Sequence, residues 1–176
     1  RHTLEEHEVR FEDQFPPSSA EIVSLYLDPT NGSLGESIPA DSSVSYESTT
    51  DNGVLRFVHR FERDTEVTGP MALRCYMSTD AGCDMDLFVG LRKYDRRGEE
   101  VLFPDLNHIE NGQVAYGWLR VSHRATDPAR STPWQPWRQH DTLEKLRPGE
   151  IVPVDIEILP TATLYRAGES MVLTVQ

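Results

Sequence analysis

The sequence predicts an all-β fold, an antiparallel β-sandwich, and three observations support this prediction. Short apolar segments with alternating side chains recur at intervals of roughly ten residues, the spacing typical of sandwich strands. Gly, Pro, Asp and Asn, which favour turns, stand between these segments. The strand–helix–strand rhythm of a parallel sheet does not occur, so an α/β nucleotide-binding or hydrolase sheet is not expected in this chain.

The expected strands follow one another along the chain. A first strand is expected at 21–27, and residues 31–53 are expected to be a surface loop with one weak strand at 43–46. A turn is expected at Gly69-Pro70, before the strand at 71–78, and a hairpin turn is expected at residues 95–98. Within the region of the strands, only residues 142–146 are expected to be helical. The remaining strands are expected at 54–60, 71–78, 86–94, 99–103, 114–123, 151–158 and 171–175.

At 176 residues the chain is long enough for one domain with a substantial core. Residues 1–20 are polar and charged, with a pattern compatible with a helical turn at 4–10, and Pro16-Pro17 ends any regular element. We therefore expect residues 1–20 to connect to an upstream domain and residues 21–176 to form the sandwich. The start at Arg1 rather than Met indicates a fragment or a processed product.

The charge balance restricts the partners. Against 17 Lys and Arg stand 29 Asp and Glu, a formal net charge of -12, which repels phosphate backbones and anionic lipid. Nucleic acid and membranes are therefore not expected as partners. Solubility is the favoured explanation of the acidity, with cation binding or a basic partner surface as the alternative. No apolar run reaches the roughly 20 residues of a membrane span. No export leader is visible, and the compartment stays open with the cytoplasm slightly favoured.

No complete catalytic set is found, and no catalytic residue is assigned. A serine hydrolase elbow has the pattern G-x-S-x-G, and the two nearest matches, around Ser37 and Ser170, both lack the closing Gly. The six His show neither HxH nor HExxH spacing, so a zinc enzyme is not supported and no cofactor is expected. Cys75 and Cys83 fit no CxxC or zinc pattern, and free thiols are favoured over a local disulfide.

Three acidic residues are the candidate metal ligands. Asp80, Asp84 and Asp86 could supply oxygen ligands to calcium, but the loop lacks the spacing of a calcium-binding loop with a distal Glu. The favoured interpretation is a polar loop in which Asp86 binds backbone N–H groups at the start of a strand.

The segment 117–160 carries all three Trp, two of them in its Pro-rich loop, and the candidate interaction residues. Two indoles in a Pro-rich loop are too large an apolar area to leave in water, so they must pack on this domain, on a neighbour or on a ligand. Packing is favoured. Sugars and acyl groups are alternative ligands, and a carbohydrate-binding module with a Trp platform is the alternative function. The candidates for an interface or a substrate entrance are Trp134, Trp137, Arg138, His140 and Asp141.

Six segments in order carry a resemblance to a known family. They are Val67–Pro70, Ser78–Leu91, Gly117–Arg124, Leu146–Glu150, Ile156–Pro160 and Ala167-Gly168. Together they resemble the C-terminal jelly-roll domain of the X-Pro dipeptidyl-peptidase and cocaine-esterase (CocE/NonD) type serine hydrolases. Phe15-Pro16 followed by Leu25–Leu27 is similar to the entry of that domain, and the resemblance covers about residues 9–175.

The resemblance implies a jelly-roll β-sandwich of galactose-binding-like fold without catalytic residues. It implies that the α/β-hydrolase catalytic domain of the same polypeptide, which carries a Ser-His-Asp triad, is the partner on which this domain packs, shaping substrate access or assembly. A homo-oligomer stays open. The sequence departs from the family at Gly168-Glu169, where relatives have Gly-His. Relatives also continue past the position of Gln176 to one more strand, which the sandwich would then lack.

Overall fold

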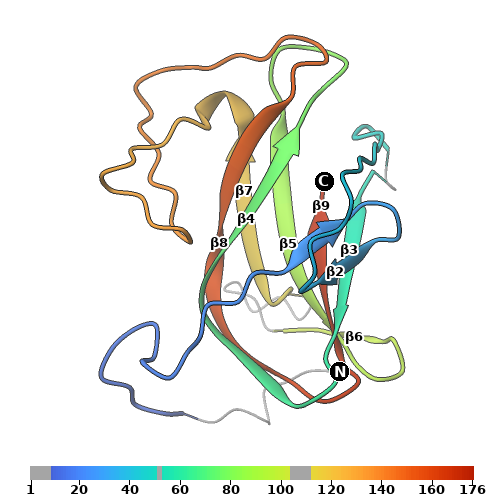
Figure 1. Cartoon of the computed structure of the whole chain (residues 1–176), viewed down its shortest axis with the longest axis vertical. Helices are drawn as coiled ribbons and strands as arrows, with labels where there is room; N and C mark the ends of the chain where they lie inside the picture. The colour runs from blue at the N-terminus through green and yellow to red at the C-terminus, as the bar shows by residue number, and fades with distance from the viewer. Residues whose placement is uncertain (1–8, 51–52, 104–111) are drawn as a thin grey trace. The chain divides into compact units, whose positions relative to one another are not determined.

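The computed structural model describes residues 9–50, 53–103 and 112–176. Within these ranges its regular secondary structure is almost entirely β-strand, which confirms the all-β class (Figure 1). The only helical element among the described residues is a 3-10 turn at Val121–His123. The strands are β1 Tyr26–Asp28, β2 Ser33–Gly35, β3 Leu55–Arg60, β4 Thr65–Met77, β5 Asp86–Tyr94, β6 Glu100–Val101, β7 Ala115–Arg120, β8 Val152–Tyr165 and β9 Ser170–Val175.

The described chain holds no helix long and apolar enough to cross a membrane.

The strands form two sheets with non-sequential pairing. One has the order β1-β2-β3-β9-β5-β6, with β7 also paired to β5, and the other consists of β4 and β8. Strands β3 and β9, which are more than 100 residues apart in the sequence, pair antiparallel over six residues, from Leu55↔Val175 to Arg60↔Ser170. Such long-range pairing cannot be read from local sequence, because only the folded chain brings these strands together.

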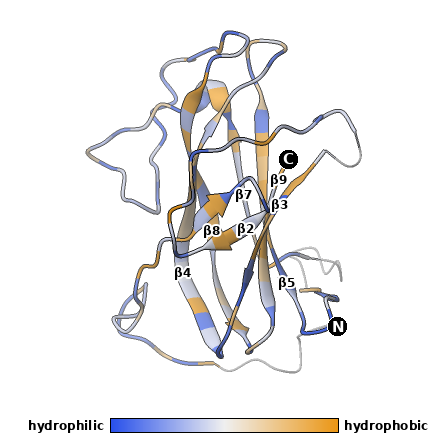
Figure 2. Ribbon diagram, turned by 45° about the vertical axis from the view of Figure 1, so that its right-hand side comes forward, coloured by the Kyte–Doolittle hydropathy of each residue, from blue (hydrophilic) through white to orange (hydrophobic). Residues whose placement is uncertain are grey.

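The chain divides into two compact units. Among the described residues, the first comprises residues 9–69, 90–115 and 161–176, and the second comprises residues 70–89 and 116–160. In Figure 2, hydrophobic residues (orange) recur along the strands of both units, whereas the long loops are mainly blue or pale.

The core of the first unit is centred on β9. All five residues from Met171 to Val175 are buried, as expected for a mainly apolar strand covered on both faces, and Thr174 is the one polar residue among them. Beside it, Phe61 stacks on the fully buried Tyr165 with ring centroids 4.6 Å apart. Aromatic pairs of this kind add to the stability that their buried area provides.

The core of the second unit follows the two-residue period of β8. Val152, Val154, Ile156 and Ile158 are buried, while the residues between them are exposed or half-buried. This alternation is what a strand with one covered face requires. The same period along β7 buries Gly117 and Leu119 and leaves Trp118 and Arg120 exposed.

Several predicted elements are confirmed. The hairpin after β5 pairs Lys93 with Val101, and the Asp95 N–H donates to the Glu99 carbonyl at 2.9 Å. The strand expected at 54–60 is β3, and 171–175 lies within β9. The strand expected at 151–158 is present, but it continues to Tyr165. The strand expected at 114–123 ends at Arg120, where the 3-10 turn begins.

Other predicted elements are wrong. The first strand covers only Tyr26–Asp28, and residues 43–46 form no strand. Residues 142–146 are not helical, because their N–H groups bind other segments: Glu144 donates to the Ser122 carbonyl at 2.8 Å and Leu146 to the Cys83 carbonyl at 2.9 Å. Most of the expected helical turn at 4–10 lies outside the described residues.

Gly69-Pro70 is not a turn either. It lies inside the long strand β4, where Gly69 has φ 127°, a conformation open mainly to glycine. Gly69 also approaches the side chain of Pro16 so closely that a Cβ would stand 3.3 Å from it. The glycine therefore serves an irregular strand and a close contact rather than a chain reversal.

Candidate functional site

The loop between the 3-10 turn and β8 contains the predicted interaction residues (Figure 1, orange). It is ordered by its own backbone bonds. Asp127 N–H donates to the Trp137 carbonyl at 2.8 Å, Gln139 N–H to the Ala125 carbonyl at 3.2 Å, and Thr126 pairs with Arg138 in an antiparallel bridge. The loop is thus folded back on itself, so it presents its side chains in a defined arrangement.

Arg138 anchors this loop to the sheet of its unit. Its guanidinium donates to the Arg124 carbonyl at 2.7 Å and to the Asp155 carbonyl in β8. Burial lowers the pKa of Arg138, although the nearby Asp155 and Glu157 act in the opposite direction. Because its donors bind backbone carbonyls, Arg138 serves the loop's own structure rather than an exposed binding site.

The two Trp of the loop differ in environment. Trp134 is half-buried, whereas Trp137 is 41% exposed. The Arg130 guanidinium lies 3.7 Å from the centre of the Trp137 ring, a cation–π contact that occupies one face of the indole. One face therefore remains for a partner, which is less than a sugar platform built from two open indoles would offer.

A shallow hollow of about 250 Å³ brings part of the candidate set together. Trp137, Arg138 and His140 line it, with Glu157 from β8; Trp134 and Asp141 do not. His140 has a positive φ of 58° and its ring centroid lies 5.5 Å from that of His123. His140 and Asp141 are exposed. The predicted residues thus form a surface around Trp137 rather than a closed site.

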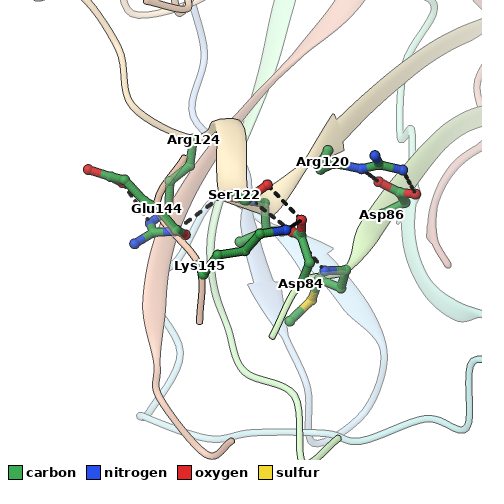
Figure 3. A network of polar contacts seen from close by, with 9 residues as sticks. Asp84, Asp86, Arg120, Ser122, Arg124, Glu144 and Lys145 are labelled. Atoms are coloured by element: carbon green, nitrogen blue, oxygen red, sulfur yellow. Dashed lines mark hydrogen bonds and ion pairs between the residues drawn. The ribbon is translucent and has the colours of Figure 1, made fainter. Parts of the chain in front are cut away.

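Asp84 is the centre of the polar network that fixes the base of the loop (Figure 3). Its Oδ2 accepts hydrogen bonds from the Ser122 hydroxyl at 2.6 Å and from Lys145 Nζ at 2.9 Å, and its Oδ1 accepts from the Ser122 N–H at 2.9 Å. Burial acts to raise the pKa of Asp84, but these hydrogen bonds outweigh it and hold the pKa well below its usual range. Ser122 is completely buried, so Asp84 satisfies groups that water cannot reach.

Asp86 does not bind backbone N–H groups, and that prediction is wrong. Asp84 has this role instead, while Asp86 forms a bidentate pair with Arg120 at 2.7 and 2.8 Å (Figure 3). The reason is strand geometry: Asp86 is the first residue of β5, and Arg120 extends over it from the paired strand β7. The third candidate ligand, Asp80, is exposed. In the described ranges no three His, Cys, Asp or Glu side chains are grouped as a metal site would need.

Two exposed aromatic side chains in the same unit were not predicted from the sequence. Trp118 on β7 is 64% exposed, and Phe88 on the paired strand β5 is exposed as well. Phe88 lies two residues from Asp86 on β5, and Trp118 lies two residues from Arg120 on β7. Both side chains therefore lie on the same solvent-facing side of these strands as the Asp86–Arg120 pair. The two-residue period could have found Trp118, because it shares a face with Arg120 and alternates with buried Leu119.

Both Cys are free, as predicted, and the structure separates their reactivity. Cys83 is exposed, whereas burial, with Asp155 nearby, raises the pKa of Cys75 to about 11. Because the thiolate is the nucleophile, we expect iodoacetamide at mildly alkaline pH to modify Cys83 and to leave Cys75 largely unreacted. Peptide mass spectrometry measures both sites. Equal labelling of the two in the folded chain would contradict this, and equal labelling in denaturant is the control.

Taken together, the all-β fold, the ordered loop and the exposed aromatic side chains define a β-domain with a surface suited to contacts. In the described residues, the hydroxyl, carboxylate and amine of the Asp84 network bind one another and are not arranged around an open substrate site. Residues 3–176 match the family model of the X-Pro dipeptidyl-peptidase C-terminal non-catalytic domain. The chain belongs to this family, which confirms the resemblance found in the sequence.

Solved structures agree. A CocE/NonD family hydrolase from Staphylococcus aureus, solved twice, is 46% identical over 96% of this chain, with a TM-score of 0.93. An aminopeptidase from a marine sediment Thaumarchaeota archaeon (17% identical, TM-score 0.64, 94% of this chain) and an alpha-amino acid ester hydrolase (15%, 0.55, 86%) share the fold. This chain spans 31%, 30% and 28% of those three proteins. No curated protein matched the chain.

Proposed function

We propose that this domain packs against the α/β-hydrolase catalytic domain of the same polypeptide, and that the Trp134–Asp141 loop forms the contact or a wall of the substrate entrance. The chain spans less than a third of the Staphylococcus aureus CocE/NonD hydrolase that it resembles at 46% identity. A hydrolase of that length has ample further chain to supply a partner surface. In this proposal residues 1–20 connect to the upstream domain and residues 21–176 form the sandwich.

The observation that carries the proposal is an exposed indole on a pre-ordered loop. Arg130 lies on one face of Trp137, whose carbonyl accepts from the Asp127 N–H and whose N–H donates to the Ser131 hydroxyl, yet Trp137 remains 41% exposed. Trp is the residue type most enriched among those that dominate binding energy at interfaces, and a rigid loop loses little entropy on docking. An exposed indole held in place is therefore better suited to a partner surface than to the domain in isolation.

The described part of the connector supports its proposed path. Arg10 forms an ion pair with Glu66 near the start of β4, with one contact at 2.9 Å, and this pair holds the pKa of Glu66 below its usual range. Pro16 lies against Gly69 of the same strand. The segment that would arrive from an upstream domain is thus tied to β4 by two contacts of its own.

Hydroxyl-radical footprinting of the three Trp tests the proposal. We expect Trp137 in the full-length polypeptide to be oxidised about tenfold more slowly than in the isolated 176-residue chain, because docking removes it from water. Trp118 is the matched control, since it starts from a higher exposure. Trp134 is already half-buried and should change least.

Each other outcome has a distinct meaning. Protection of Trp118 with Trp137 unchanged would assign docking to the β5–β7 aromatic face and overturn the role of the loop. No protection at either indole would overturn domain docking through this unit. Protection of Trp137 in the isolated chain that increases with protein concentration would assign the loop to contact between two copies of the chain.

A further inference from the structure

The first unit contains a second hollow, lined by none of the predicted interaction residues. Its volume is about 330 Å³, near the lower limit for small-ligand sites. Three arginines line it, Arg56, Arg60 and Arg96, together with Tyr94 and Ser170. Three guanidinium groups around one hollow are unexpected in a chain whose formal net charge is -12.

The strand register explains how these side chains meet. Arg56 and Arg60 lie on β3 with an even spacing, so they project from the same face, and Ser170 of β9 is the direct neighbour of Arg60. Arg96 comes from the turn after β5, where its Nε donates to the Ala167 carbonyl at 2.6 Å.

Gly168 marks the point where two of the arginines converge. A Cβ on Gly168 would lie 3.3 Å from Arg96 Cγ and 3.6 Å from Arg60 Nη2. The residue has φ +85°, a left-handed conformation that suits glycine. The backbone thus approaches both side chains closely and keeps them at one end of the hollow.

The donors of this hollow are only partly used. Arg56 reaches the Tyr94 hydroxyl at 3.5 Å, the outer limit of a hydrogen bond. Within the described part of the chain, neither the Arg60 guanidinium nor the Ser170 hydroxyl has a hydrogen-bond partner. One carboxylate, Asp95, also lines the hollow, and its Oδ1 accepts the N–H groups of Arg97 and Glu99 at 2.8 and 3.0 Å. Asp64 also interacts electrostatically with Arg96. Three guanidinium groups against these two carboxylates still leave a local excess of positive charge.

We propose that this hollow binds an oxyanion, a carboxylate or a phosphate group, with Arg60 as the principal donor and Ser170 and Arg56 beside it. The planar fork of guanidinium donors matches both anions, and such charged hydrogen bonds are about twice as strong as neutral ones. The acidic net charge of the rest of the chain disfavours anions elsewhere, so binding is local to this hollow.

The first test is a titration of the 176-residue chain with inorganic phosphate at low ionic strength, monitored through the backbone amide chemical shifts. Saturable shifts are expected at residues 56–60, 94–98 and 168–170. Arg60→Gln should raise the dissociation constant for phosphate about tenfold, the loss of affinity expected for one charged hydrogen bond. Arg63→Gln is the matched control: it removes the same charge from an exposed position near Arg60 and should change the constant by less than about twofold.

Two ligands distinguish the sources of the anion. If the blocked dipeptide Ac-Glu-Glu-amide binds more tightly than phosphate, the hollow takes a carboxylate from a protein segment. If phosphate binds more tightly, it takes a free or organic phosphate. Equal weakening by Arg60→Gln and Arg63→Gln, or no saturable shift with either ligand, would overturn the proposal. Unchanged melting temperatures show that both variants are folded.

Discussion

Replacement of Gly117 by Ala is expected to cost about 3 kcal/mol of unfolding free energy, the upper range for overpacking of a core. A Cβ at this position would stand 2.4 Å from the Glu157 carbonyl oxygen and 3.2 Å from Ile156 Cγ2. The nearest atom belongs to the backbone of β8, so no rotamer change can relieve the contact. The close approach of β7 and β8 in the second unit must then widen, and the buried residues around it lose packing.

Urea denaturation followed by tryptophan fluorescence measures this effect. Gly35→Ala is the matched control, because Gly35 also lies in a strand and no atom is within 4 Å of its added Cβ. Its cost should stay within about 0.5 kcal/mol. Equal denaturation midpoints for the two variants would show that β7 and β8 have room for a methyl group.

Replacement of Asp84 by Ala is expected to have a similar effect, about 3 kcal/mol. Ser122 is fully buried, and the change removes the carboxylate that accepts from its N–H and its hydroxyl. These two donors would be left without an acceptor. It also leaves Lys145 without its ion pair. Leaving buried donors unsatisfied costs more than the net value of the hydrogen bonds themselves.

Asp86→Ala is the control for Asp84→Ala. It also removes an Asp carboxylate, two residues further along the chain, but the side chains of Asp86 and its partner Arg120 are 42% and 59% exposed. Exposed ion pairs contribute little, so the expected cost is below about 1 kcal/mol. If Asp86→Ala destabilises the chain as much as Asp84→Ala, then burial of Ser122 is not the source of the effect.

The pH dependence gives an independent check on Asp84. Its pKa in the folded chain lies below the ordinary value of 3.8, so the folded state favours the ionised form. The resulting stability is fully present above that ordinary value and is lost as the pH falls through the folded-state pKa. The difference in unfolding free energy between the wild type and Asp84→Ala should therefore be constant near neutral pH and shrink on acidification below the ordinary value. A difference that grows on acidification would contradict this assignment.

The Asp84 network also connects stability to the proposed docking surface. It joins the segment before β5, the 3-10 turn through Ser122 and the end of the loop through Lys145. Arg124 adds a pair with Glu144 at 3.2 Å across the same loop (Figure 3). Loss of Asp84 is therefore expected to loosen the loop that presents Trp137, which would weaken docking even where the chain still folds.

The family and the all-β class could be read from the sequence because they depend on local features. The alternation in β8 and the apolar run of β9 reflect which side chains need cover, and turn residues such as those at 95–98 act through their own backbone. Free thiols followed from spacing alone. The order of six short motifs, each weak by itself, was enough to identify the family that the match over residues 3–176 confirms.

The details of the site required the folded chain. Whether 142–146 forms a helix depended on carbonyls of Cys83 and Ser122, which are distant in sequence. Which of Asp84 and Asp86 holds the backbone depended on where Arg120 and Ser122 lie.

Periodicity and turn chemistry are properties of neighbouring residues, so the sequence by itself determined most of the long strands, the fold class and the family. Tertiary structure decided which group each buried donor binds. It also decided that Trp118 is more exposed than Trp134 and that Arg60 and Arg96 converge at Gly168. The physical reason is that a hydrogen bond or a hollow is made by groups from separate strands, and only the long-range pairing of those strands brings them within reach.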